Sequence, residues 1–389
     1  MTTGSPDRTM APAHDRSAVA AALGGLCAIA AGIGIGRFVY TPILPSIMAA
    51  LGLSQSKAGL IASANFFGYL IGALAAAMPA LPGTRRHWLL GALAVSALTT
   101  AAMGLAETMA QYLSLRFVGG AASAFVLIFG SAIVLEHLAE IARPGLSALH
   151  FAGVGSGIAV SAALVAGVLQ LGQSWRALWL ASGALSLGGL AATVVLLPRR
   201  AAPAQPSGPR TRIALDPRFK RLIAAYGLFG FGYVITATFL VAIVRGTPAI
   251  RPLQPMIWIV FGLAAAPSVA LWAWIARPLG NPGAFALACV IEAAGVLASV
   301  SWQTTLGAFA AAVLVGGTFM GLTALGLVEA RALAKSDPRR ALALMTGAFG
   351  FGQIIGPVFA GIVSDRLGSF AAPSIAAVVA LLVAAGLAK

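Results

Sequence analysis

Apolar runs about as long as a membrane-spanning helix occupy most of this sequence, and short polar stretches separate them. A hydrocarbon layer about 30 Å thick needs about 20 apolar residues in a helix to cross it. The runs are rich in Ala, Gly and Leu, and they lack the alternation of apolar and polar residues typical of barrel strands. Since only helices and closed barrels satisfy their backbone groups in lipid, the runs predict an all-α integral membrane protein.

The charge content supports this prediction. Only 9% of the 389 residues are charged, whereas 59% are hydrophobic. A soluble domain of this length would expose a much more highly charged surface. The net charge of +15 could suggest a nucleic-acid partner. However, the basic residues lie in short loops between apolar runs, where they orient spans and form no groove, so we expect a lipid bilayer and no nucleic acid.

Twelve spans can be delimited, and the one long polar segment divides them into two sets of six. The predicted spans are 18–42, 57–79, 88–106, 110–136, 146–171, 175–197, 222–244, 255–276, 283–302, 304–333, 340–364 and 370–388. The predicted organisation is an N-terminal cytoplasmic tail (1–17), a six-helix bundle (18–197), a cytoplasmic linker (198–221) and a second six-helix bundle (222–389).

The basic residues also predict an orientation. With the N-terminus inside, 18 of the 25 Lys and Arg residues fall on the inner side, five fall outside, and Arg37 and Arg116 lie within spans. This bias satisfies the positive-inside rule. We therefore expect both termini in the cytoplasm and the protein in the inner membrane of a bacterium.

Glycine pairs repeat between the two sets of spans at an offset of 196 or 197 residues. The pairs are Gly34 and Gly230, Gly119 and Gly316, and Gly153 and Gly350. They occupy equivalent spans of the two halves, so they predict a parallel repeat of two six-helix bundles.

Three stretches carry a closer likeness. They are Gly34 to Pro42 (GIGRFVYTP), His150 to Gly157 (HFAGVGSG) and Gly352 to Pro357 (GQIIGP). With the twelve-span layout, the sequence resembles the major facilitator superfamily, and within it the YbfB/YjiJ group. The resemblance implies two six-helix bundles around a central site, a small-molecule substrate, no cofactor and a monomer.

Two superfamily motifs can be compared with this sequence. Residues 116–122 (RFVGGAA) resemble the span-4 motif, whose Arg is implicated in proton coupling. The motif between spans 2 and 3 keeps only Gly83, Arg85 and Arg86, and its Asp position is Ala80. Residues 361–368 (GIVSDRLG) match most of that second motif, but the expected topology places them outside, so no gate is assigned to them.

Ionisable groups inside spans are costly and are therefore candidates for function. On an uninterrupted helix, Arg37 would share a face with Gly34 and Tyr40, where it could bind an anionic group or snorkel outward. Asn65 lies on a stripe of small residues that could equally serve helix packing. The predicted substrate-binding residues are Arg37, Tyr40, Asn65, Arg116, Tyr226, Tyr233, Thr346 and Gln353.

Other residues are candidates for coupling or gating. His150 could relay protons or bond a neighbouring helix, and Glu292, at the centre of span 9, could couple transport or be buried for structural reasons. The full set is Arg116, His150, Glu292, Glu136, Glu329, Arg85 and Arg86. The histidines and acids are too scattered for a metal site, and no catalytic set is visible, so we expect neither a metal nor an enzyme.

The preferred hypothesis is a secondary transporter that moves a small organic anion by alternating access, with possible coupling to protons. Proton-driven efflux of neutral or cationic drugs is the main alternative, but few acids lie on the central helices. A non-transporting membrane sensor or enzyme is a second alternative. No soluble effector domain supports it.

Overall fold

The structure, a computed structural model, describes residues 10–78, 81–198, 216–334 and 337–389, and all the regular structure of these residues is helical. The first half of the chain contains α1 (Met10–Ile29), η1 (Ala30–Ile35), α2 (Tyr40–Leu51), α3 (Gln55–Ala76), α4 (Arg85–Ala102), α5 (Met109–Glu140), η2 (Pro144–Leu146), α6 (Ser147–Gln170) and α7 (Trp175–Leu196). The second half contains α8 (Pro217–Gly246), η3 (Pro248–Leu253), α9 (Gln254–Ala265), α10 (Ser268–Ser301), α11 (Thr305–Leu333), α12 (Pro338–Leu367) and α13 (Ala371–Leu387).

These helices make twelve crossings, as the sequence predicts. Nine helical segments of the described chain are long and apolar enough to span a membrane, and α4 and the shorter α13 add two more crossings. The twelfth arises at Gly280, where a left-handed φ of 69° interrupts α10. The part of α10 before Gly280 completes the crossing that α9 begins, and the part after it crosses back. The prediction of a twelve-helix, all-α membrane protein is confirmed.

Some boundaries differ from the predicted ones. The first crossing does not end at Pro42 but continues through α2 to Leu51, because η1 and a turn redirect the helix and do not end it. Helix α1 begins at Met10, inside the predicted tail, and α8 begins at Pro217, inside the predicted linker. Ala80, residues 1–9 and residues 199–215 lie outside the described part of the chain.

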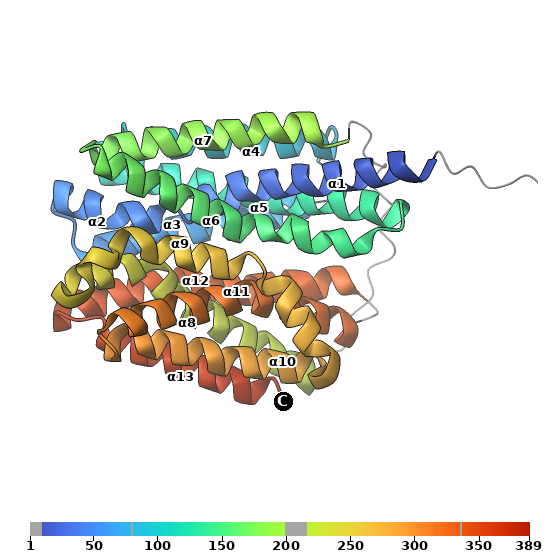
Figure 1. The fold of residues 1–389 in the computed structure, drawn as a ribbon. Helices are drawn as coiled ribbons and strands as arrows, with labels where there is room; N and C mark the ends of the chain where they lie inside the picture. The colour runs from blue at the N-terminus through green and yellow to red at the C-terminus, as the bar shows by residue number, and fades with distance from the viewer. Residues whose placement is uncertain (1–9, 79–80, 199–215, 335–336) are drawn as a thin grey trace, which may run out of the picture.

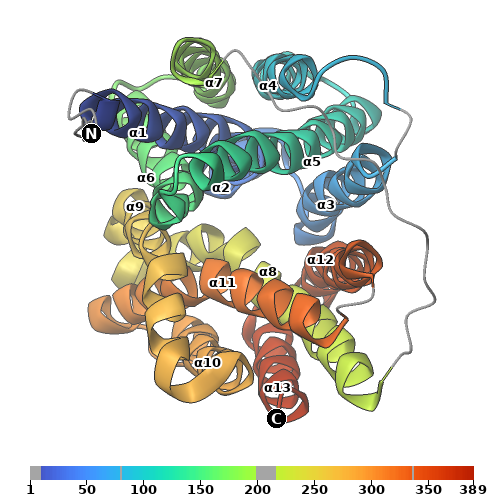
Figure 2. The ribbon, with the colours of Figure 1, turned by 90° about the vertical axis from the view of Figure 1, so that its right-hand side faces the viewer.

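The two halves form separate helical groups. Figure 2 shows α1 to α7 on one side and α8 to α13 on the other, with α3 beside α12 and α6 beside α9. We name the two ends of the bundle for the description that follows. The linker end is where α7 ends and α8 begins, and the far end is where α2 ends and α3 begins. In Figure 1 the linker end lies to the right and the far end to the left.

Within each half, a glycine of the first crossing lets a neighbouring helix of the same half approach closely. A Cβ atom at Gly34 would lie 2.6 Å from the Gly157 Cα on α6, and one at Gly230 would lie 2.5 Å from the Phe349 carbonyl oxygen on α12. Both distances are too short for any side chain. Gly34 and Gly230, a pair of the sequence repeat, therefore have the same role in the two halves. Each lets two helix backbones come into contact.

Candidate functional site

The first crossing is broken midway, between α1 and α2. Residues 30–35 form a π-helical turn, and residues 36–39 form a hydrogen-bonded turn before α2 begins. Three glycines in 32–36 weaken the helix there, and Pro42 has no N–H to continue the hydrogen-bond ladder. Such breaks are tolerated in membranes where neighbouring side chains satisfy the freed backbone groups. Because Arg37 lies in the turn, the regular helical face predicted for it does not form.

Arg116, on α5, bonds the backbone at this break. Its Nη1 donates to the Gly36 carbonyl oxygen and its Nη2 to the Arg37 carbonyl oxygen, both at 3.1 Å. Its guanidinium carbon lies 4.9 Å from the centre of the Tyr40 ring. The Asn65 side-chain amide, on α3, donates to the Arg116 carbonyl oxygen at 2.9 Å. These contacts give Arg116 and Asn65 a role in holding the broken segment.

The Arg37 side chain is buried and has free donors. Only 7% of the residue is exposed, and its Nε and Nη2 atoms have no hydrogen-bond partner among the described residues. Its guanidinium carbon lies 4.2 Å from the ring centre of Tyr69, 5.0 Å from that of Phe66 and 5.6 Å from that of Phe38. Aromatic rings stabilise a cation but leave its N–H groups available to a ligand.

The second half faces Arg37 with an aromatic stack. The Tyr233 ring, on α8, lies parallel to the Phe319 ring of α11 and the Phe349 ring of α12, with centroid separations of 5.6 and 5.7 Å. Gln353 is fully buried, donates from Nε2 to the Tyr233 hydroxyl, and keeps an unpartnered Oε1. The Phe38 ring, next to Arg37 in the chain, lies 5.9 Å from the Phe319 ring of this stack, measured between ring centroids, so the two halves meet beside Arg37.

The other predicted binding residues are less available. The Tyr40 hydroxyl donates to the Ala58 carbonyl oxygen at 2.8 Å, and the Tyr226 hydroxyl donates to the Thr323 carbonyl oxygen at 3.1 Å. Thr346 is half-buried on α12. Four of the predicted binding residues keep buried, unpartnered polar atoms: Arg37, Asn65, Arg116 and Gln353. Asn65 and Arg116 also donate to backbone carbonyl oxygens around the broken segment, so Arg37 and Gln353 are the candidates that a ligand could use.

The predicted coupling and gating residues do not gather in one place. Arg85 and Glu136 pair at 2.6 Å near the linker end, within the first half. Arg86 donates to three carbonyl oxygens around the end of α7. His150 is buried, with its Nε2 3.0 Å from the Ser131 hydroxyl. Glu329 accepts from Asn281 at 3.4 Å, and Glu292 is fully buried on α10.

Sequence reasoning missed a contact between the halves at the far end. Asp365, near the end of α12, accepts hydrogen bonds from the Gln55 and Ser56 backbone N–H groups, both at 2.9 Å, and from the Ser56 hydroxyl. It therefore caps the first turn of α3 in the opposite half. Residues 361–368 carried the signal for this contact, because they match most of the motif found between spans 2 and 3. The sequence analysis assigned no gate to them, since the expected topology places them outside.

Two further hydrogen bonds join the halves nearer the middle. The Ser63 hydroxyl, on α3, donates to the Ile354 carbonyl oxygen, and the Thr41 hydroxyl, on α2, donates to the Ala237 carbonyl oxygen, both at 2.7 Å. No group of three or more His, Cys, Asp or Glu side chains that could hold a metal ion occurs in the described parts of the chain.

Two six-helix groups that meet around buried polar side chains, with a broken first crossing, form the architecture found in transporters built from parallel repeats. The family model described as "Uncharacterised MFS-type transporter YbfB" matches residues 29–389. The chain belongs to this family of major facilitator transporters, as its resemblance in sequence implies.

Solved structures share the fold. The nucleoside transporter NupG, crystallised as a point mutant, is 14% identical with a TM-score of 0.71, over 95% of this chain and 98% of that one. A bacterial homologue of the human lysosomal transporter Spinster, inward-facing and occupied, is 16% identical with a TM-score of 0.69, over 99% and 97%. Its inward-facing, unoccupied form gives a TM-score of 0.67 at the same identity and coverage. No curated protein matches the sequence.

Proposed function

We propose that this transporter carries a small organic anion across the bacterial inner membrane by alternating access, and that Arg37 binds the anionic group. The observation that carries the proposal is a buried guanidinium with two unpartnered nitrogens at the meeting point of the halves. Among the described residues the salt bridge joins Arg85 and Glu136, and no carboxylate pairs with Arg37. A buried charge without a counter-charge is costly, and a bound anion would remove that cost.

The geometry of the groups around Arg37 favours a carboxylate with an apolar body. A guanidinium fork matches the two oxygens of a carboxylate. The stack of Phe319, Tyr233 and Phe349 offers a flat apolar wall. The free Oε1 of Gln353 could accept one further hydrogen bond from the ligand.

The distribution of charge supports a cytoplasmic linker end. Most of the basic residues in loops fall at that end, as the positive-inside rule requires. In this orientation the halves are joined on the outer side, where Asp365 caps α3, and such a contact supports an inward-facing state. A cysteine introduced at Lys57, which is exposed at the far end, should react with an impermeant thiol reagent added outside intact cells. Reaction only in inverted vesicles would reverse the proposed orientation.

Efflux of amphipathic drugs is the second candidate. The aromatic stack favours it, because rings bind hydrophobic compounds of many shapes. The buried positive charge of Arg37 opposes it, since a cationic drug would meet a like charge.

A thermal-shift screen of the purified protein against carboxylates, sugars, nucleosides and hydrophobic amines separates these functions. A ligand at one hundred times its Kd stabilises the folded protein by about 2.7 kcal/mol. We expect a carboxylate to stabilise the wild type and to move into proteoliposomes. Hits confined to amines would replace the anion proposal with efflux. Folded protein that neither binds nor moves any solute would revive a sensor role.

Substitutions at Arg37 test the site itself. Hydrogen bonds to charged groups contribute about 1.5–3 kcal/mol, so Arg37→Gln should weaken carboxylate binding about 10- to 150-fold. Arg37→Lys keeps the charge but loses the fork, and its affinity should lie in between. Arg176→Gln is the matched control, because it removes one positive charge from α7, where Arg176 bonds the Gly104 carbonyl oxygen. Equal affinity in Arg37→Gln and Arg176→Gln would rule out the assigned role of Arg37.

A further inference from the structure

Glu292 faces the interior of the second bundle. It lies near the middle of the part of α10 that follows Gly280, and none of its surface is exposed. Phe285, Cys289 and Val296, which share its helical face, are also buried. The opposite face of the helix is exposed at Leu287, Val290 and Leu297, as expected for residues in contact with lipid. Because the face that carries Glu292 is buried and the opposite face is exposed, the carboxyl group points away from lipid.

Neither carboxyl oxygen of Glu292 has a hydrogen-bond partner among the described residues. The helices that pack on α10 bring few titratable groups towards it. Tyr233 on α8 and Cys289 on α10 itself interact with it electrostatically. The remaining titratable side chains of the helices packed on α10 are Arg218, Lys220, Arg221, Tyr226 and Arg245 of α8, Glu329 and Arg331 of α11, and His150 of α6, whereas α9 and α13 have none.

A proton is the ligand that this setting suits. An ionised carboxylate with no partner in an apolar interior is very costly, and such a group takes up a proton instead. A hard metal ion would need several oxygen ligands, and no cluster of metal-binding side chains occurs in the described parts of the chain. A purely structural acid would be expected to have a partner, because buried polar groups are nearly always hydrogen-bonded.

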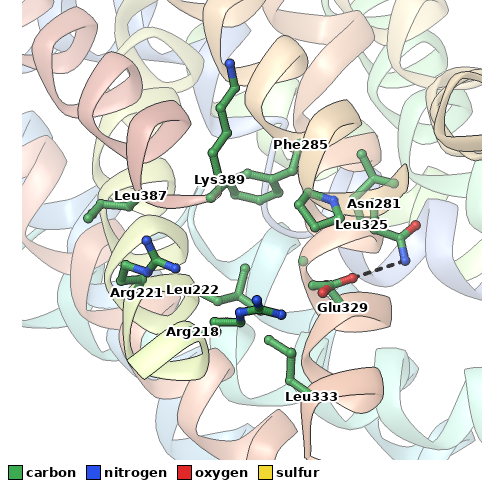
Figure 3. Close-up of a pocket in the computed structure, with 13 residues that line it drawn as sticks. Arg218, Arg221, Leu222, Asn281, Phe285, Leu325, Glu329, Leu333, Leu387 and Lys389 are labelled. Carbon is green, nitrogen blue, oxygen red and sulfur yellow. Dashed lines mark hydrogen bonds between the residues drawn. The ribbon is translucent and has the colours of Figure 1, made fainter. Parts of the chain in front are cut away.

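A cavity with charged residues in its lining lies at the linker end of the second bundle (Figure 3). Its volume is about 260 Å³. The exposed Arg218 and Arg221 of α8, together with Asn281, Glu329, Lys389 and Phe285, are among the residues that line it. Phe285 precedes Glu292 by seven residues on the same helical face, a rise of about 10 Å. The cavity therefore brings the solvent at the linker end to within about two helical turns of the carboxyl group.

We propose that Glu292 is a proton-binding site that exchanges its proton with the linker end in this conformation and is linked to the Arg37 site through Tyr233. Phe285, on the helical face of Glu292, packs against Phe229, and Phe229 stacks on Tyr233, with ring centroids 6.2 and 5.2 Å apart. Tyr233 in turn bonds Gln353. A change in the charge of Glu292 therefore acts on the side chains that we propose to contact the substrate. The proton site stands on the burial of Glu292, whereas the linkage rests on the proposed function.

Infrared difference spectroscopy of the purified protein at low and high pH tests the proton site without any substrate. We expect the wild type to show the band of a protonated carboxylic acid that disappears as the pH rises. Glu292→Gln, which mimics the neutral acid in shape, should lose that band. Glu107→Gln, which changes an exposed acid in the loop between α4 and α5, is the control and should keep it. A wild type without the band, or a Glu292→Gln protein that retains it, would overturn the site.

The linkage has its own test. The affinity of the carboxylate found by the ligand screen should change with pH in the wild type and become independent of pH in Glu292→Gln. Tyr233→Phe keeps the carboxyl group but removes the hydroxyl, so it should shift the pH at which the infrared band disappears. If Glu292→Gln does not fold, the wild type and Tyr233→Phe still decide the site. If the infrared band appears but no carboxylate binds, the proposed transport of an organic anion is refuted, whereas the proton site at Glu292 stands.

Discussion

Because Asp365 joins the two halves at the far end, changing this one side chain should shift the equilibrium between the states that are closed and open at that end. Asp365→Ala removes the acceptor for two backbone N–H groups and the Ser56 hydroxyl. Loss of a helix N-cap costs about 0.5–2 kcal/mol. Asp365 is exposed, so water can replace part of the lost contact. We therefore expect the state that is closed at the far end to lose about 1–2 kcal/mol relative to the open one, a 5- to 30-fold change in their ratio.

The assay is a distance measurement between spin labels at Lys57 and Leu367, which are exposed on opposite sides of this contact. The short-distance population of the wild type should shrink in Asp365→Ala, and a longer distance should grow. Glu107→Ala is the matched control, because it removes a negative charge from the loop between α4 and α5, at the same end but within one half. Distance distributions that match in all three proteins would refute the role of Asp365 as a gate.

Two further predictions concern the packing around the gate and the broken helix. A Cβ atom at Gly59 would lie 2.1 Å from the carbonyl oxygen of Pro357 in the other half, so Gly59→Ala should increase the distance between the same spin labels. Gly91→Ala is the control, because a Cβ atom there has nothing within 4 Å, and it should leave the distances unchanged. Arg116→Gln should lower the free energy of unfolding by about 2–4 kcal/mol, because the Gly36 and Arg37 carbonyls lose charged donors. Denaturant titration in detergent measures it, and unchanged stability with weaker ligand binding would instead make Arg116 a binding residue.

Hydrophobicity and charge were sufficient to predict the architecture. The twelve crossings follow from runs of apolar residues whose length is set by the bilayer, and this constraint acts on each helix separately. Interruptions inside a crossing were harder to predict. The break at residues 30–39 depends on Arg116, which is 79 residues beyond Arg37 in the sequence and becomes its neighbour only after folding. The boundary at Gly280, by contrast, was predicted, because Arg277, Pro278, Asn281 and Pro282 separate two apolar runs there.

The candidate site was predictable only in part. Arg37, Gln353 and Glu292 were singled out because polar groups are rare in apolar spans, and they are buried polar groups with unpartnered atoms in the structure. Their residue types could not reveal which hydrogen bonds were already used. Arg116 and Tyr40 have the same chemistry as binding residues, yet their polar groups bond the backbone. Asp365 was missed because its partner is the backbone of α3, and backbone N–H groups leave no mark in a sequence.

The position of Arg37 suggests how a substrate could influence the gate. Arg37 lies in the broken segment of the first half, and Gln353 lies on α12, the helix that carries Asp365. A ligand shifts a conformational equilibrium only by its difference in affinity for the two states. An anion that touches both Arg37 and Gln353 has such a difference, because a rocking motion of the halves changes the distance between these residues. Four residues after Arg37, the Thr41 hydroxyl bonds the Ala237 carbonyl of the other half, so a movement of the broken segment also strains a contact that joins the halves. The break in the first crossing therefore places the binding cation and a contact between the halves on one short, deformable segment.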